Sequence, residues 1–557
     1  MKTPILSLMI SALLTLGPIL NVHAQPQNEQ LHLDAVTRIR DEGLNRSQIM
    51  KTITHITDNI GPRLSGSPSL REANEWTRDQ FTELGLNARL EGFDFGKGWT
   101  FDHVSVHMTA PRNIPLLAYP RAWTPGTDGA VRGIVERVTL EKEADLEKHR
   151  GNLAGKILLM DSSREIAEGD RSMVQRHDDH SLEAVVDFPI PSERTPAEGM
   201  NAVERFLFRE KLHAYLVEQG VVATLYISSW DYGIIRLGAG AAHEVAAQPG
   251  VPSLQMGAEH YNLLSRLAAD EQSVELEIRV DAQFHENDLQ AYNTIADLPG
   301  QGRLADEIVM AGAHLDSWHA GAGATDNASG VAIVMEALRI LKAIGVEPRR
   351  TIRAALWSGE EQGLLGSRAY VARHIATRPA ATDEEQLWVP ERIRDLTWPV
   401  QTLPGHAKHI AYFNFDNGTG KIRGVHAQQN VASKPIFEAW LYPLHDLGAD
   451  TVALRSVGST DHIPFDGVGV PGFQFIQDRL DYSTRTHHSH LDTLDYVRRE
   501  DLMQAAVVMA TFLYHAAMRD EPFPRKPVPE KPPADPAEEK AKQAWKELNE
   551  AVTPVTQ

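Results

Sequence analysis

Uniformly apolar runs divide residues 307–367 into a strand, a helix and a second strand. Residues 308–313 (IVMAGA) contain no polar position, which is typical of a strand covered on both faces. Residues 351–357 (TIRAALW) form a second apolar run. Between them, apolar residues recur at helical spacing and stop at Gly345, which is typical of a helix end: Val334, Leu338, Leu341 and Ile344. The pattern predicts a strand–helix–strand unit of an α/β sheet.

Side chains that bind metals or protons follow these apolar runs, where loops should begin. Two more apolar runs, 410–415 and 470–476, are followed by an acid and by a histidine-rich stretch. Sites of open α/β sheets form beyond the carboxyl ends of the strands, because the sheet holds loop residues rigidly there. We therefore expect five residues to meet at one edge: His314, Asp326, Glu361, Asp416 and His488.

Two histidines and three carboxylates form a ligand set that suits zinc and is too large for one ion. Shared between two ions about 3.5–4 Å apart, the set allows a bridging carboxylate, a bound hydroxide and a polarised carbonyl. A general base must take the proton from the attacking water, and Glu360, the neighbour of Glu361, is the candidate. Each residue also has a common structural explanation, such as a helix cap at Asp326-Asn327. The pattern alone leaves a metal site and ordinary structural roles open.

The pattern changes along the chain and predicts more than one folded unit, as expected for 557 residues. Short strand-like runs separated by polar or Gly-rich loops predict a β-rich insert, and the α/β pattern resumes at Tyr292. We divide the chain into five parts: an export segment (1–24), an N-terminal part of the main domain (25–126), the insert (127–283), the main domain (284–520) and a tail rich in Pro and charge (521–557), expected to be a linker and a solvated helix rather than core.

The first 24 residues have the features of a cleaved export signal: Lys2, an apolar run from Pro4 to Leu20, and small residues before Gln25. The chain contains 0 Cys, which excludes disulfides and thiolate zinc sites. An exported protein without cysteine suggests a bacterial periplasm or exterior, and after signal removal we expect no membrane association. The net charge of −20 and the absence of basic stripes argue against binding to nucleic acid.

Six motifs carry these residues: HLDSW (314–318), TDNASG (325–330), WSGEEQGLLGS (357–367), FNFDNG (413–418), GSTDHIPF (458–465) and HHSHLDT (487–493). Together they resemble the co-catalytic di-zinc exopeptidases, peptidase family 28 of the MH clan, which contains bacterial aminopeptidases and glutamate carboxypeptidases. The HLDSW and HHSHLDT forms look most like the plasma glutamate carboxypeptidase-like members. The resemblance covers about residues 310–500 and, weakly, GPRLSGS (61–67).

The resemblance implies a phosphorylase/aminopeptidase-like α/β fold, a three-layer mixed sheet with helices on both faces. It also implies that the insert is a β-rich protease-associated domain, because GNLAGKILLMD (151–161) and VPSLQMGAEHYNLLSRLA (251–268) look like parts of that module. The stretch after Asp161 is longer than usual for the module, so how the insert covers the site is left open.

The same resemblance implies two Zn²⁺ per subunit and a role for each motif residue. Asp326 bridges the ions, and Glu360 is the general base. His488 is chosen over His487 and His490 because it lies four residues before Asp492. The resemblance places His314 and Asp416 on the two sides of the site, and Glu361 and His488 complete the ligand set. Asp316 and Asp461 resemble carboxylates that lie behind the ligands, and His487 stands where some relatives have an oxyanion-stabilising Tyr.

We expect an exported zinc aminopeptidase or dipeptidase that acts on peptides or dipeptides, with a homodimer also implied by the resemblance. A carboxypeptidase of the glutamate carboxypeptidase type is the first alternative, and Arg423 or Arg485 would then be candidates for holding a substrate carboxylate. A glutaminyl cyclase and a non-catalytic receptor-like protein are further alternatives. Other peptidase mechanisms are disfavoured, because HEVAA and HENDL lack the second His of HExxH and no Ser lies in G-x-S-x-G.

Overall fold

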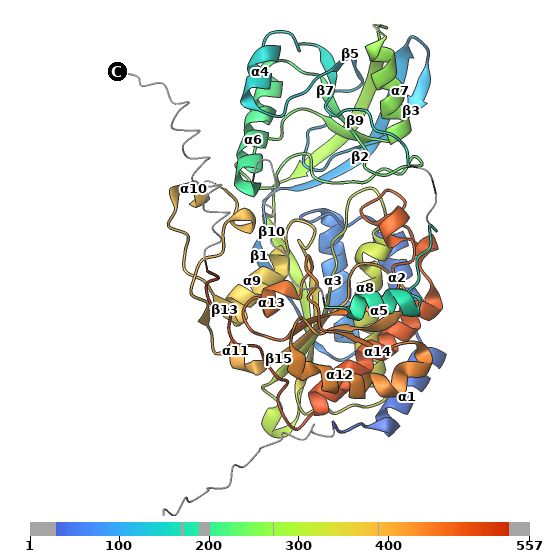
Figure 1. Cartoon of the computed structure of the whole chain (residues 1–557), viewed down its shortest axis with the longest axis vertical. Helices are drawn as coiled ribbons and strands as arrows, with labels where there is room; N and C mark the ends of the chain where they lie inside the picture. The colour runs from blue at the N-terminus through green and yellow to red at the C-terminus, as the bar shows by residue number, and fades with distance from the viewer. Residues whose placement is uncertain are drawn as a thin grey trace, which may run out of the picture.

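The computed structural model describes residues 29–167, 169, 172–188, 201–270, 272–387 and 389–533. The expected export segment 1–24 and the tail after residue 533 lie outside these ranges. The described chain forms two α/β units, one above the other in Figure 1, each built on an eight-stranded sheet. No helix within the described ranges is long and apolar enough to cross a membrane.

The lower unit is built on a mixed sheet whose four central strands, β12, β11, β15 and β18, run parallel. They are the four apolar runs of the sequence, which confirms those strand predictions. Antiparallel strands flank them on both sides. In spatial order the strands are β1 (Asn87–Asp94), β10 (Gln290–Leu298), β12 (Thr351–Trp357), β11 (Ile308–His314), β15 (His409–Asn414), β18 (Gly472–Gln477), β16 (Ile422–His426) and β17 (Thr451–Ala453).

Helices cover both faces of this sheet, and the central strand β11 shows why. Val309, Ala311 and Ala313 belong to the core on one face, whereas Met310 belongs to a separate core on the other. Because successive side chains of a strand point to opposite faces, a strand without polar positions must be covered twice. The first face carries α1 (Leu33–Asn45), α2 (Ile49–Thr54), α3 (Pro68–Glu83), α8 (Ser329–Ala343) and α14 (Arg499–Met518), and the second carries α9 (Leu365–His374) and α13 (Ile463–Asp466). The three-layer α/β fold is confirmed.

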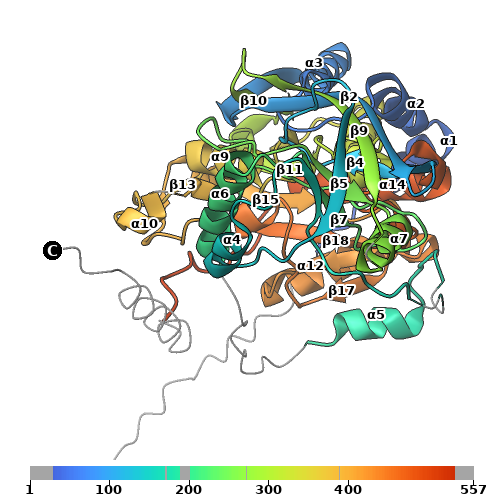
Figure 2. The same ribbon diagram turned by 90° about the horizontal axis from the view of Figure 1, so that it is seen from above.

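The upper unit contains the second sheet, and Figure 2 shows it lying over the lower unit. The chain enters it after β1 and leaves it before β10, which pair with each other below. Its strands begin at Gly98, ahead of the expected boundary at residue 127, and the existence of a separate inserted domain stays a prediction. In spatial order they are β3 (Ile114–Leu116), β2 (Gly98–Ala110), β9 (Glu275–His285), β5 (Val131–Arg137), β6 (Lys156–Leu159), β7 (Ala223–Ile227), β8 (Ser253–Met256) and β4 (Ala118–Pro120).

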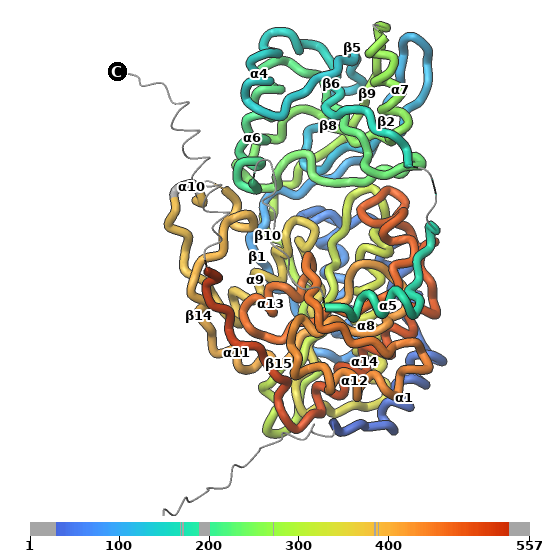
Figure 3. The backbone as a smooth tube through the Cα atoms, viewed as in Figure 1, coloured from blue at the N-terminus to red at the C-terminus, as the bar shows by residue number. Residues whose placement is uncertain are grey.

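The first part of the tail packs on the lower unit, contrary to the expectation of a linker outside the core. Phe523 is 3% exposed and lies among the rings of Phe437, Trp440 and Phe473. The guanidinium of Arg525 donates to the carbonyl oxygen of His406 at 2.9 Å. Figure 3 shows this last described segment running along the lower unit. One buried aromatic residue therefore anchors a stretch that its composition assigned to solvent.

Replacing Phe523 by Ala should lower the free energy of unfolding of the lower unit by about 3–5 kcal/mol, because it leaves a cavity among three aromatic rings. Urea unfolding followed by tryptophan fluorescence measures the change. Tyr442→Ala, which removes a ring that is 69% exposed, should change the value by about 0.5 kcal/mol or less. Equal effects of the two variants would show that the tail does not contribute to the core.

Candidate metal centre

The carboxyl ends of the four central strands bring the five expected ligands to one place. His314 is the last residue of β11, and Asp326 lies in the turn η3 (Ala324–Ala328) before α8. Glu361 follows β12, Asp416 follows β15, and His488 lies in the loop after β18. Four of the side chains are no more than 5% exposed, and that of His488 is 21% exposed. The charged groups are therefore almost completely shielded from water.

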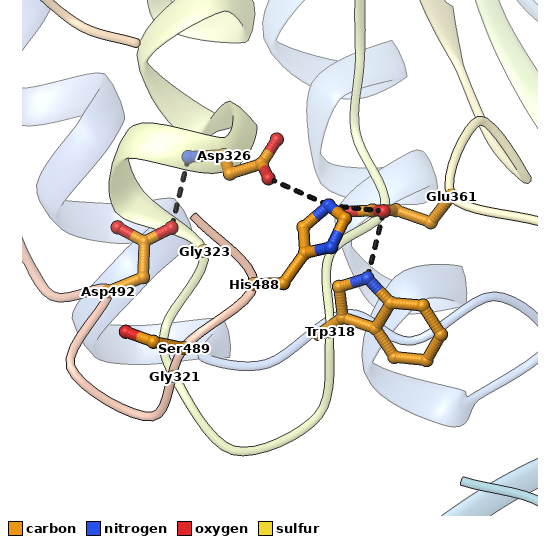
Figure 4. A pocket seen from close by; sticks show the side chains of 8 residues that line it. All are labelled: Trp318, Gly321, Gly323, Asp326, Glu361, His488, Ser489 and Asp492. Atoms are coloured by element: carbon orange, nitrogen blue, oxygen red, sulfur yellow. Dashed lines mark hydrogen bonds and ion pairs between the residues drawn. The ribbon is translucent and has the colours of Figure 1, made fainter. Parts of the chain in front are cut away.

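The Asp326 carboxylate lies between the two histidines. Its Oδ1 is 3.2 Å from Nε2 of His314, and its Oδ2 is 3.3 Å from Nε2 of His488. His314 also lies 3.4 Å from Asp416 Oδ1, and His488 lies 3.0 Å from Glu361 Oε2. Figure 4 shows the second half of this chain of contacts, from Asp326 through His488 to Glu361. One carboxylate thus faces two donor groups, the arrangement expected of a bridging ligand.

Of the pair Asp326-Asn327, which the sequence suggested as a helix cap, Asn327 is the residue that bonds to the first turn of α8. Asn327 Oδ1 accepts a hydrogen bond from the Gly330 amide at 3.0 Å, which caps the start of α8. The Asn327 amide also donates to the Phe415 carbonyl oxygen at 2.8 Å. The peptide bond between Asp326 and Asn327 is cis. Asn327 therefore performs the capping, and the side chain of Asp326 remains directed into the site.

The donor set fits metal ions of the zinc type. Ligand atoms of His314, Asp326 and Asp416 lie within 4.8 Å of one another, and so do those of Asp326, His487 and His488. Glu361 Oε1 is buried and has no hydrogen-bond partner among the described residues. A buried carboxylate oxygen without a partner is costly unless a cation completes it. His487 is the second histidine within reach, so the geometry alone admits it beside His488.

Asp316 orients His314 through its main-chain carbonyl oxygen and the Glu360-Glu361 pair through its carboxylate. His314 Nδ1 lies 2.9 Å from the main-chain carbonyl oxygen of Asp316, and because a carbonyl only accepts, Nδ1 carries the hydrogen and Nε2 is left for a ligand. The Asp316 carboxylate lies farther away, 3.6 Å from Nδ1. It accepts hydrogen bonds from the amides of Glu360 and Glu361, both at 3.3 Å. Asp316 thus lies behind the ligands, as expected, but its carboxylate chiefly holds the Glu360-Glu361 turn.

The proposed general base, Glu360, is surrounded by negative charge. Burial raises its pKa well above the ordinary value, and the neighbouring carboxylates of Asp416, Asp461 and Glu361 raise it further, whereas the charge of His314 opposes them. A carboxyl group with a raised pKa holds a proton more readily, which is the property a general base needs.

His487 and Asp461 are at the site, but the geometry does not fix their roles. The His487 ring stacks on Tyr482 with centroids 4.6 Å apart, and burial lowers its pKa to about 4, so the ring is neutral near pH 7. Asp461 is fully buried and accepts a hydrogen bond from the Ser367 hydroxyl at 2.5 Å. Burial raises the pKa of Asp461 to about 7. The assigned roles of both residues stay predictions.

Two positioning residues, Asp492 and Arg63, were not assigned a role from the sequence. The Asp492 carboxylate accepts the amides of Thr325 at 2.7 Å and Asp326 at 3.0 Å, as Figure 4 shows for Asp326. Arg63 is completely buried, and its guanidinium donates to the carbonyl oxygens of Leu315 and Ala322, both at 2.8 Å. Asp492 lies in the motif HHSHLDT and Arg63 in GPRLSGS, and their place in these motifs was the sequence signal that could have identified them. They hold the backbone on either side of the ligands.

Two aromatic side chains also contact the ligand carboxylates. The Trp318 indole donates to Glu361 Oε2 at 2.8 Å, and the Tyr482 hydroxyl donates to Asp326 Oδ2 at 3.3 Å. Trp318 closes the HLDSW motif. Tyr482 had no sequence signal, because it precedes the histidine motif by five residues and only the turn η7 (Tyr482–Thr486) brings it back to the site.

The two arginines named from the sequence as candidates for holding a substrate carboxylate form ion pairs within the protein. Arg423 pairs with Asp478 at 3.3 Å, and Arg485 pairs with Asp481 at 3.6 Å. Arg236 of the upper unit is different, because its buried Nε and the rest of its guanidinium have no hydrogen-bond or ion-pair partner among the described residues. It forms an antiparallel bridge with Ser489, which lines the pocket of Figure 4. Residues opposite each other in such a bridge have their side chains on the same face, so the Arg236 side chain lies on the same face as that of Ser489.

Comparisons with known proteins match the chain to one family. The model described as peptidase family M28 matches residues 293–513. Carboxypeptidase Q of Mus musculus is 24% identical over 493 residues, which cover 88% of this chain and 90% of that protein.

Two solved structures share the fold. The peptidase M28 precursor from Shewanella amazonensis superimposes with a TM-score of 0.62 at 22% identity, covering 89% of this chain and 99% of that one. A zinc aminopeptidase from Bacillus subtilis superimposes with a TM-score of 0.53 at 18% identity, covering 85% and 95%.

Replacing His488 by Ala should lower the zinc content of the purified protein by about one ion per chain, because the Asp326–Glu361 group loses its nitrogen donor. Inductively coupled plasma mass spectrometry measures the content. His490→Ala is the matched control, since Nδ1 of His490 accepts the Ile235 amide at 3.2 Å instead of facing the cluster. An unchanged content in the His488 variant, with loss in His487→Ala, would move the ligand to His487.

Proposed function

We propose an exported aminopeptidase or dipeptidase with two zinc ions, from the premise that residues 293–513 belong to peptidase family M28 and that the chain is a metallo-exopeptidase. The observation that carries the proposal is the Asp326 carboxylate, whose two oxygens face two different histidines. The pattern of residues 1–24 supports export, and the sequence resemblance supports a homodimer. The substrates we propose are peptides or dipeptides with a free amino end.

The donors divide into two groups around Asp326. His314 and Asp416 would hold one ion, and His488 and Glu361 would hold the other. When bound, the two ions supply Lewis-acid polarisation of the scissile carbonyl and of the attacking water. Trp318 orients Glu361, and the Asp316 carbonyl oxygen orients His314, so the donors are in place before any ion arrives.

Glu360 carries the proton in this proposal. Its carboxylate takes a proton from the water as the new C–O bond forms, and it returns that proton to the amide nitrogen as the C–N bond breaks. Burial and the neighbouring carboxylates raise its pKa, which favours the protonated intermediate state of this transfer. The Asp316 carboxylate fixes the backbone of Glu360 through the bond to its amide.

A carboxypeptidase is the second candidate, and Arg236 is the observation that favours it. A guanidinium without a partner among the described residues, opposite the pocket-lining Ser489, suits the carboxylate of a substrate's C-terminal end. The name of carboxypeptidase Q, a relative along most of the chain, agrees with this candidate. The cyclase and receptor alternatives are disfavoured, because all five donors and Glu360 are present and assembled.

Replacing Glu360 by Gln should leave the zinc content unchanged and lower kcat by about 10²- to 10⁴-fold, because only the proton carrier is lost. The assay is hydrolysis of free dipeptides and amino-acid p-nitroanilides, run before chelation, after chelation and after return of zinc. Glu347→Gln, an exposed glutamate away from the site, is the matched control. Parent-like turnover in the Glu360 variant would refute the assignment, and chelator-resistant cleavage by the parent would refute a metal mechanism.

Substrate pairs that differ only at the ends should identify the direction of cleavage. If Arg236 reads a carboxylate, a dipeptide should exceed its C-terminal amide in kcat/KM by about 10- to 100-fold, and Arg236→Gln should abolish the difference. Arg479→Gln removes the same charge from the loop that carries His488, where Arg479 contacts Ser483, and should keep the difference. N-blocked dipeptides complete the set: their cleavage would favour the carboxypeptidase, and their exclusion would favour the aminopeptidase or dipeptidase.

A further inference from the structure

One segment of the upper unit leaves that unit and lies against the lower one. Residues 172–187, here named the strap, contain α5 (Asp179–Val186). Figures 1 and 2 show α5 in the teal colour of the upper unit, apart from the rest of that unit and beside the lower sheet. The strap belongs to the stretch after Asp161 that is longer than usual for a protease-associated module. Neither the fold nor the proposed chemistry accounts for it.

The strap forms backbone bonds with the loop after β18. The Gln175 amide donates to the Leu480 carbonyl oxygen at 3.0 Å, and the Leu480 amide donates to the Gln175 carbonyl oxygen at 2.7 Å. The Thr484 hydroxyl donates to the Met173 carbonyl oxygen at 2.5 Å. These bonds hold the loop on both sides of Tyr482, whose hydroxyl contacts Asp326.

A forked ion pair fastens the strap next to these bonds. The Arg176 guanidinium donates to Asp478 at 2.9 Å and to Asp501 at 2.8 Å. The two carboxylates are 1% and 4% exposed; Asp478 keeps a second partner, Arg423 at 3.3 Å, whereas Arg176 is the one side-chain partner of Asp501 among the described residues. The His177 amide donates to the other oxygen of Asp478 at 2.8 Å. The buried Asp501 carboxylate would lose its partner if Arg176 were removed, which makes Arg176 an anchor of the strap, with its own side chain 44% exposed.

An apolar contact completes the attachment. Leu182 of α5 is 7% exposed and packs against Ala453 of β17 and Ile476 of β18. The carboxylate of Asp178 caps α5 by accepting the Ser181 amide at 2.9 Å. The strap is therefore an ordered element with its own cap and its own small core, and its position against the sheet edge is specific.

The far end of the same loop is also held by the upper unit. The Leu237 amide donates to the His488 carbonyl oxygen at 2.6 Å, and Arg236 bridges Ser489. His488 has a φ of 57°, a left-handed conformation that costs a residue with a side chain roughly 1–2 kcal/mol. Such a conformation persists only where the surroundings impose it. The contacts at 480–484 and at 488–489 are those surroundings.

We propose that the strap is a positioning element of the metal site. By fastening residues 478–484 through Arg176 and Gln175, it holds the Tyr482 hydroxyl against Asp326 and holds His488 in position to bind a metal ion. Arg176 acts through the loop and touches neither substrate nor metal. The upper unit thus helps to assemble the site instead of only limiting access to it. The inference rests on the proposed function in one respect, the assignment of His488 as a metal ligand.

The test compares Arg176→Ala and Arg176→Lys with the parent in zinc affinity. A titration with a competing chromophoric chelator measures it. Arg176→Ala should weaken binding of one of the two ions by about tenfold or more, the size expected when a residue that supports a ligand is lost, and leave the other unchanged. Arg176→Lys, which keeps the charge, should recover part of the loss. Arg40→Ala is the matched control, because Arg40 also joins distant segments, donating to Asp446 at 2.7 Å and to the Pro443 carbonyl oxygen at 2.8 Å, away from the site.

Hydrogen exchange on the metal-free protein supplies the second readout. Arg176→Ala should speed exchange at residues 478–490 and not in α8. If the single variant leaves the strap attached, the double variant Arg176→Ala with Leu182→Ala removes both anchors. Faster exchange in the loop with parent affinity for both ions would overturn the proposal. A parent that binds two zinc ions but cleaves no peptide would overturn the proposed function and leave this test valid.

Discussion

The burial of several carboxylates at one sheet edge is the constraint on which the rest of the structure depends. Asp326, Glu361 and Asp416 are almost completely shielded from water, and Glu360 lies beside them. Two like charges 4 Å apart repel by about 4 kcal/mol at the effective dielectric of protein surfaces, and burial increases the cost. Bound cations compensate such a group, as does uptake of protons by some of the carboxyls. The donor set is therefore suited to metal ions, with two histidines among the carboxylates.

The fold positions these carboxylates by fixing the main chain on either side of them. The Asp492 carboxylate accepts the amides of Thr325 and Asp326. The Arg63 guanidinium donates to carbonyl oxygens of the loop between β11 and α8. Asp316 holds the amides of Glu360 and Glu361. Asp492 and Arg63 are satisfied by bonds to main-chain amides and carbonyl oxygens. Donors fixed in this way need no reorganisation when an ion binds.

The upper unit is part of the same arrangement. It contacts the His488 loop at 480–484 through the strap and at 488–489 through residues 236–237. It also contributes Arg236, the one guanidinium near the pocket without a partner among the described residues. Ligand geometry and recognition of the substrate's end would thus both depend on a unit that contains none of the five donors.

The sequence by itself determined the parts that depend on local pattern. Apolar runs located β11, β12, β15 and β18, and the segment after each run contained a donor, because the carboxyl ends of parallel strands converge in any sheet of this kind. The family resemblance placed His314 and Asp416 on the two sides of the site, whereas the structure brings them within 3.4 Å of each other. The resemblance also supplied the bridging role of Asp326 and the choice of His488. The contacts of the structure agree with that choice, since His490 is bonded to Ile235, although His487 remains within reach.

Only the tertiary structure decided the contacts between residues far apart in the chain. Arg236 meets Ser489 across more than 250 residues, and Arg176 meets Asp501 across 325. A local pattern carries no information about such pairs, so Arg423 and Arg485 looked more suitable than Arg236, and Phe523 looked like part of a solvated tail. The physical reason is the same in each case. Local spacing fixes which face a side chain occupies, whereas its partner depends on how two separately predicted elements pack.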